Sequence, residues 1–163
     1  MGSGDFLTVG ADNLNKGVRG DIAMYRIMVV DDEEYILKAL NRVLAARPDW
    51  EVETYTNAAT ALRRARTTVL DAVLTDYRMP DMDGIEMLQQ LRGMQPEAIR
   101  ILLTGVIDID TLMSAINQAG AFRFVHKPWD DDQLLQSIEE GLKFRDILVE
   151  NKILAQTVRD QRE

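Results

Sequence analysis

The sequence predicts an α/β fold: a doubly wound parallel sheet of five strands, covered by helices on both faces. Five short apolar runs alternate with five stretches of helical periodicity between residues 25 and 145. This alternation is typical of strand–helix–strand units. Most of the runs are apolar throughout rather than at every second position, which indicates strands buried on both faces.

The elements follow in chain order, with each strand preceding one helix. The expected strands are residues 26–30 (RIMVV), 51–56 (EVETYT), 71–75 (DAVLT), 99–104 (IRILLT) and 121–126 (AFRFVH). Apolar residues three and four positions apart predict the helices. They are Ile36, Leu37, Leu40, Val43 and Leu44; Ala58, Ala61, Leu62 and Ala65; Ile85, Leu88 and Leu91; Ile109, Leu112, Met113 and Ile116; and Leu134, Leu135, Ile138 and Leu142. An Asp-x-x-Gln capping box at 130–133 begins the last of them.

Three segments make up the chain. Residues 1–24 lack a clean apolar period, and we expect a leader that is weakly structured or derived from cloning. Residues 25–145 form the domain. Residues 146–163 continue the last helix, and we expect a linker to an effector that lies beyond this chain.

The tail carries a second apolar pattern. Phe144, Ile147, Asn151, Leu154 and Val158 alternate at spacings of three and four, as in a coiled-coil seam. Two interpretations stay open at this point. The helix pairs with another helix, or it folds back on the surface of its own domain.

Composition excludes several classes of function. The chain has no cysteine and one histidine, His126, so it has neither a thiolate zinc site nor a histidine-rich metal site. The net charge of −8 argues against a nucleic-acid binder. No apolar run approaches the length of a membrane span or of a signal peptide core, so we expect a cytoplasmic protein.

Polar residues gather where the expected strands end. Asp31 and Asp32 follow the first strand, Asp76 the third, Thr104 ends the fourth and Lys127 follows the fifth. Ligands of open parallel sheets bind beyond the carboxyl ends of the strands. We therefore expect these five side chains to converge on one edge of the sheet.

The chemistry of this set points to phosphoryl transfer. Three carboxylates at close range repel one another unless a cation lies among them, and an all-oxygen set selects a hard ion such as Mg²⁺. Asp32 would bind the ion directly, Asp31 through water, and the backbone carbonyl of Arg78 would complete the shell. Asp76 is best placed as the nucleophile.

Four motifs, VVDDEE, LTDYRMPDMDG, LLTG and HKPW, closely resemble the receiver domain of two-component response regulators. The resemblance covers residues 25–145 and implies a flavodoxin-like fold with strand order 2-1-3-4-5. It implies that Asp76 accepts a phosphoryl group, with Mg²⁺ bound and with Thr104 and Lys127 on the phosphoryl oxygens. Thr104 and Phe124 would form the conformational switch, and the Lys127–Pro128 peptide would be cis.

The resemblance also predicts partners. A histidine kinase or phosphotransfer protein would supply the phosphoryl group, and the chain would catalyse only its own phosphorylation and dephosphorylation. A homodimer is expected through the C-terminal helix or through the face made by the fourth helix, fifth strand and fifth helix. Receivers joined to HD-GYP cyclic-di-GMP phosphodiesterases and those of hydrogenase-type NtrC-like regulators share the finer pattern.

Other interpretations of these residues stay open. Asp31 and Asp32 could stabilise a helix N-terminus through its dipole, Lys127 could be a surface lysine, and Phe124 could be plain core. Two rival functions belong to different classes: a phosphatase-type hydrolase and a pseudo-receiver that never takes phosphate. The first would carry a second aspartate where Arg78 stands; the second would lack Asp32, Asp76 or Lys127.

Overall fold

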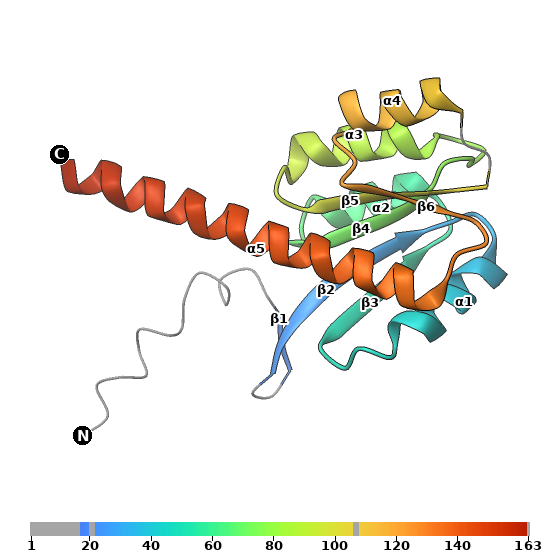
Figure 1. Ribbon diagram of the computed structural model, residues 1–163, viewed down its shortest axis with the longest axis horizontal. Helices are drawn as coiled ribbons and strands as arrows, with labels where there is room; N and C mark the ends of the chain where they lie inside the picture. Colours follow the sequence, from blue (N-terminus) through green and yellow to red (C-terminus); the bar gives the residue numbers. More distant parts are fainter. Residues whose placement is uncertain (1–16, 20–21, 106–107, 163) are drawn as a thin grey trace.

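The computed structural model describes residues 17–19, 22–105 and 108–162 of the 163-residue chain (Figure 1). Five parallel strands form its centre. They are β2 (Ile22–Val30), β3 (Trp50–Tyr55), β4 (Ala72–Asp76), β5 (Ile99–Thr104) and β6 (Arg123–His126). Their spatial order is β3-β2-β4-β5-β6, which is the order 2-1-3-4-5 when the parallel strands are counted along the chain. The predicted fold class is confirmed.

The amino-terminal boundary differs from the prediction. Strand β1 (Gly17–Arg19) pairs antiparallel with the first residues of β2, so β2 begins at Ile22 rather than at Arg26. The expected leader of residues 1–24 therefore includes part of a strand pair, and its residues 1–16 and 20–21 lie outside the described ones. The early part of β2 extends past β3 and β4, and β1 satisfies its backbone groups there.

Five helices connect the strands. They are α1 (Glu34–Leu44), α2 (Ala58–Ala65), α3 (Gly84–Met94), α4 (Ile109–Asn117) and α5 (Asp131–Arg162). Side chains cap α2, α3 and α4: Asn57, Asp83 and Asp108 each accept a hydrogen bond from the backbone N–H three residues later. At the start of α5, Asp130 accepts from the Gln133 N–H, which is half of the expected capping box.

The helices form two layers around the sheet (Figure 1). Helices α1 and α5 cover one face, where α5 contributes Leu134, Leu135, Ile138 and Leu142 to a buried cluster with β2, β4 and β5. Helices α2, α3 and α4 cover the other face through a second buried cluster. The inner strands β2, β4 and β5 are thus buried on both faces, as their continuous apolar runs predict, whereas the outer strands β3 and β6 are partly exposed.

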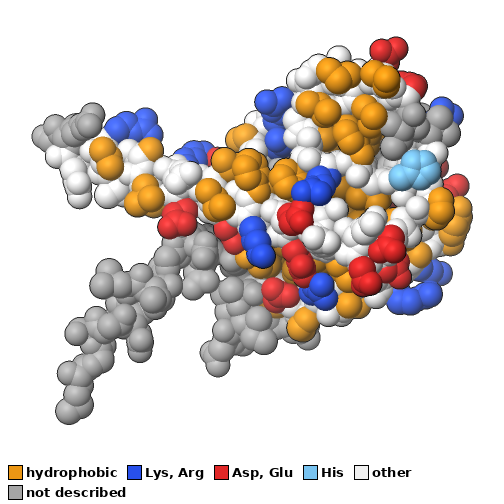
Figure 2. Space-filling view, in the orientation of Figure 1, with side chains coloured by type: hydrophobic (Ala, Val, Ile, Leu, Met, Phe, Trp, Pro, Cys, Tyr) orange, Lys and Arg blue, Asp and Glu red, His pale blue; other side chains and the backbone are white. Residues whose placement is uncertain are grey.

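Helix α5 is 32 residues long and only its first part lies on the sheet. Val149 is the last buried residue of the helix, and residues 150–161 are exposed as α5 projects from the domain (Figure 1). Figure 2 shows hydrophobic side chains gathered along α5 and over α4. No helix among the described residues is both long and apolar enough to cross a membrane.

Candidate functional site at the carboxyl edge of the sheet

The five residues predicted for the site lie at the ends of four neighbouring elements. Asp31 directly follows β2, Asp76 and Thr104 are the last residues of β4 and β5, and Lys127 directly follows β6. Asp32 lies one residue further along the loop to α1. Because the strands are parallel, their carboxyl ends meet at one edge, and the sheet itself assembles the set.

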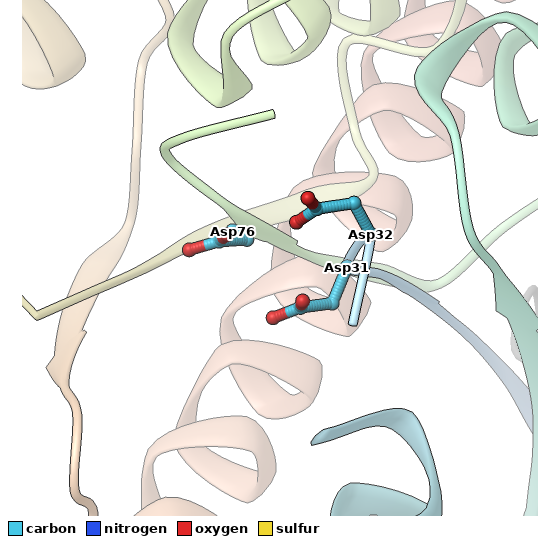
Figure 3. A group of neighbouring side chains, drawn as sticks. All are labelled: Asp31, Asp32 and Asp76. Atoms are coloured by element: carbon cyan, nitrogen blue, oxygen red, sulfur yellow. The ribbon is translucent and has the colours of Figure 1, made fainter. Parts of the chain in front are cut away.

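Three carboxylates converge at this edge. One oxygen each from Asp31, Asp32 and Asp76 lies within 4.8 Å of the other two, and Figure 3 shows their side chains meeting from the ends of β2 and β4. Asp31 is fully buried, Asp76 is 9% exposed, and Asp32 is exposed to solvent. The trio therefore has one open side, by which a small ligand can enter.

Lys127 neutralises part of this charge. Its Nζ lies 2.6 Å from Oδ2 of Asp31 and 3.1 Å from Oδ1 of Asp76. The backbone N–H of Lys127 donates to the Thr104 carbonyl at 3.0 Å, which ties the end of β6 to the end of β5. The Lys127–Pro128 peptide is cis, as the family resemblance implies.

The pKa values reflect this crowding. Burial raises the pKa of the Asp76 carboxyl, the nearby charge of Asp31 raises it further, and Lys127 opposes both. Burial lowers the pKa of the Lys127 ammonium, but its contacts with Asp31 and Asp76 outweigh burial and raise that pKa overall. The Lys127 ammonium is thus held in its charged form between Asp31 and Asp76.

The residues present fit a hard divalent cation. Three carboxylates facing one ammonium leave an excess of negative charge, and the set contains neither nitrogen nor sulfur ligands. The acidic trio is therefore able to hold a metal ion. The identity of that ion as Mg²⁺, and a ligand role for the Arg78 carbonyl, are predictions that pass to the proposal below.

Gly84 shapes the site and was not singled out from the sequence. A Cβ at this position would lie 2.2 Å from the backbone oxygen of Asp76, so α3 can approach the end of β4 only with a glycine here. The Gly84 N–H also donates to the Tyr77 carbonyl at 2.8 Å and closes the loop after β4. The Asp-Gly pair at 83–84 predicts a turn, but the close approach depends on tertiary packing.

The two residues expected to form the switch, Thr104 and Phe124, lie on the neighbouring strands β5 and β6. Thr104 is buried at the end of β5, one residue past Leu103, which pairs with Asp76. Phe124 is half-buried on β6 and packs against the cluster under α2, α3 and α4. A half-buried ring is compatible with both a switch and plain core, so the role of Phe124 stays a prediction.

Comparison with known proteins places the geometry in context. Residues 27–139 match the profile of the response regulator receiver domain. The hydrogenase transcriptional regulatory protein HoxA of Bradyrhizobium diazoefficiens is 34% identical over 117 residues, which cover 72% of this chain and 24% of that protein. The chain thus spans about a quarter of the length of the curated relatives it matches.

Solved structures agree with the sequence match. The signal receiver domain of an HD domain-containing protein from Pseudomonas fluorescens Pf-5 is 31% identical with a TM-score of 0.72, and the match covers 76% of this chain and 98% of that one. The beryllofluoride-activated NtrC4 receiver domain dimer is 27% identical with a TM-score of 0.70, covering 75% and 99%. The finer resemblance is confirmed to the extent that these relatives include hydrogenase and NtrC-type regulators and the receiver of an HD domain-containing protein. Receiver domains are typically signalling modules rather than enzymes.

Proposed function

Because the chain belongs to the response regulator receiver family, we propose that it is a phospho-accepting switch in which Asp76 receives the phosphoryl group. One observation carries this proposal. Asp76 lies at the end of the central strand β4 beside two further carboxylates and within 3.1 Å of the Lys127 ammonium. A carboxylate in this position can act as a nucleophile, with the Lys127 ammonium beside it to neutralise charge on a phosphoryl group.

The transfer follows from these positions. An oxygen of Asp76 attacks phosphorus, the bond from phosphorus to the donor's histidine nitrogen or leaving oxygen breaks, and the donor takes that electron pair. Lys127 and the Thr104 hydroxyl contact the phosphoryl oxygens and stabilise their charge. Mg²⁺, held by Asp31, Asp32, Asp76 and the Arg78 carbonyl, would neutralise the remaining charge.

The response is proposed to spread through β5 and β6. Thr104 moves towards the phosphoryl group, Phe124 follows it, and the face of α4, β6 and α5 changes shape. On the outer side of α4, Ile109, Met113 and Ile116 are exposed, which supports a partner on this face (Figure 2). Such a switch requires a bias of only a few kcal/mol between two existing states.

The projecting part of α5 is proposed to pair with the same helix of a second copy. Ile147 and Leu154 are each 55% exposed and Val158 is 48% exposed, so these three positions of the seam are open to solvent. A homologous receiver has been solved as a dimer, which supports dimerisation as such. Such a helix pair would hold the effectors of two copies together further along the polypeptide.

Incubation with acetyl phosphate and Mg²⁺ tests the proposal. We expect intact-mass analysis to give a gain of one phosphoryl group, lost in Asp76→Asn, with no continued release of phosphate. Continued turnover would support a hydrolase instead, and an unchanged mass would support a receiver-like scaffold. A mass gain that persisted in Asp76→Asn would assign the phosphoryl group to another residue.

A further inference from the structure

A buried ion pair lies at the opposite edge of the sheet from the candidate site. Arg145 of α5 is only 3% exposed, and its Nη1 lies 3.0 Å from Oδ1 of Asp71, which is fully buried. Within the described part of the chain, the Arg145 Nε has no hydrogen-bond partner. Two charges removed from water in this way give little net stability, so a role in fixing geometry explains the pair better.

Asp71 is a fixed point in the sheet. Its backbone N–H donates to the Arg26 carbonyl at 2.9 Å, and its carbonyl accepts from the Ile99 N–H at 3.0 Å. Its Oδ2 accepts from the Arg26 N–H at 2.7 Å. Asp71 is thus held by residues of β2 and β5, and Arg145 is bound to a point that cannot shift without the sheet.

Arg145 lies where α5 leaves the domain. Next to it, Asp146 accepts a hydrogen bond from the Tyr25 hydroxyl at 2.7 Å, and one turn later Val149 is buried. The Lys152 ammonium reaches Glu97 with its side chain 69% exposed, and the rest of the helix after Val149 is in solvent. Figure 1 shows α5 projecting from the domain. The contacts of Arg145, Asp146 and Val149 are thus among the last that hold the helix before it projects.

We propose that Asp71 and Arg145 are positioning residues, and that their pair fixes the direction of the projecting part of α5 both before and after Asp76 is phosphorylated. The part that concerns the phosphorylated protein rests on the proposed function. Asp71 directly precedes β4 and Asp76 ends it, so one five-residue strand joins the anchor of α5 to the phosphoryl acceptor. The signal is then a change of the α4–β6 surface beside a stationary helix, rather than a swing of the helix.

Spin labels on this cysteine-free chain test the proposal directly. The two labels are attached at Gln89→Cys on α3 and Arg159→Cys on α5, both at exposed positions. Mixing labelled with excess unlabelled protein removes the distances between labels on different copies. We expect a narrow distribution of distances between the two labels, and the same distribution with and without beryllofluoride and Mg²⁺. Arg145→Met and Asp71→Asn should each broaden it at least twofold. Lys152→Met, the matched control on the same helix, should leave it unchanged.

Each outcome decides the matter. Folded Arg145→Met and Asp71→Asn variants with the narrow distribution of the wild type would overturn the anchoring role. A shifted wild-type distribution in beryllofluoride would overturn the stationary helix. Arg145→Lys keeps the charge and should give a narrower distance distribution than Arg145→Met. If Arg145 only filled space, the two variants would give equally broad distributions.

A second measurement covers variants that fail to fold. In the wild-type protein, the backbone amides of α5 should exchange as slowly up to Val149 as they do around Leu142. If slow exchange ended before Arg145, the proposal would be overturned. The two proposals fail separately. The absence of a phosphoryl mass gain would remove the proposed function, whereas the distances in the unphosphorylated protein would still measure the anchor.

Discussion

Replacing Gly84 with alanine tests how closely α3 must approach the phosphoryl acceptor. The added Cβ would lie 2.2 Å from the Asp76 oxygen, 3.0 Å from the Asp76 carbonyl carbon and 3.0 Å from Cδ1 of Leu102. Two of these contacts are with backbone atoms, so a side-chain rotation cannot relieve them. The end of β4 or the start of α3 has to move.

The expected cost follows from two opposing effects. Overpacking a tight interior site destabilises by about 1–3 kcal/mol. Alanine is favoured over glycine by about 1 kcal/mol inside a helix, but Gly84 is the first residue of α3, where this preference has little effect. We therefore expect Gly84→Ala to lower the free energy of unfolding by about 1–3 kcal/mol, and to slow phosphorylation because the Asp76 backbone is displaced.

Gly93→Ala in the same helix is the matched control. A Cβ at Gly93 meets nothing within 4 Å, so alanine should gain a few tenths of a kcal/mol to about 1 kcal/mol from helix propensity alone. Urea unfolding of both variants, together with the rate of phosphorylation by acetyl phosphate, gives the comparison. If Gly84→Ala were as stable as Gly93→Ala and reacted at the wild-type rate, the reasoning on close approach would be wrong.

Three further predictions concern charge and assembly. Lys127→Met should destabilise the metal-free protein by about 3 kcal/mol in urea unfolding, because fully buried Asp31 loses its cation, and added Mg²⁺ should recover part of that loss. If Lys127→Met bound beryllofluoride as tightly as the wild type, the role assigned to Lys127 at the phosphoryl oxygens would be wrong. Folding raises the pKa of the Asp76 carboxyl, so the metal-free wild type loses stability as pH rises from the unfolded-state pKa through the folded-state pKa. Asp76→Asn should remove this loss, which thermal unfolding in chelator measures across pH. Asn151→Leu should strengthen self-association or change the number of copies in sedimentation experiments, because asparagine in a seam trades stability for register. An unchanged concentration dependence would argue against pairing through α5.

Local patterns were sufficient for most of the fold. The run IRILLT predicts β5 at residues 99–104 as observed, and the strand predicted at 71–75 is shifted by one residue, to Ala72–Asp76. Strand ends move by a few residues because hydrogen bonding to neighbours, rather than residue type, decides where a ladder stops. The predicted strand 121–126 begins only at Arg123 for the same reason.

The convergence of Asp31, Asp32, Asp76 and Lys127 could also be predicted, because parallel topology brings strand ends to one edge. The features that were missed are tertiary. Three residues of β1 carry too short a pattern to identify a strand, and the Asp71–Arg145 pair joins positions far apart in the chain with no local signal. The close packing at Gly84 likewise exists only once α3 lies against β4.

Helix α4 is attached to the domain by few buried contacts. Among its described residues only Ala115 is buried, while Ile109 is 75% exposed and Met113 and Ile116 are about half exposed. Little apolar surface is lost when such a segment opens, so its local unfolding requires much less free energy than unfolding the sheet. A modest energetic input at the end of β5 is therefore enough to melt or shift α4, whereas the same input would leave a well-buried helix such as α3 in place.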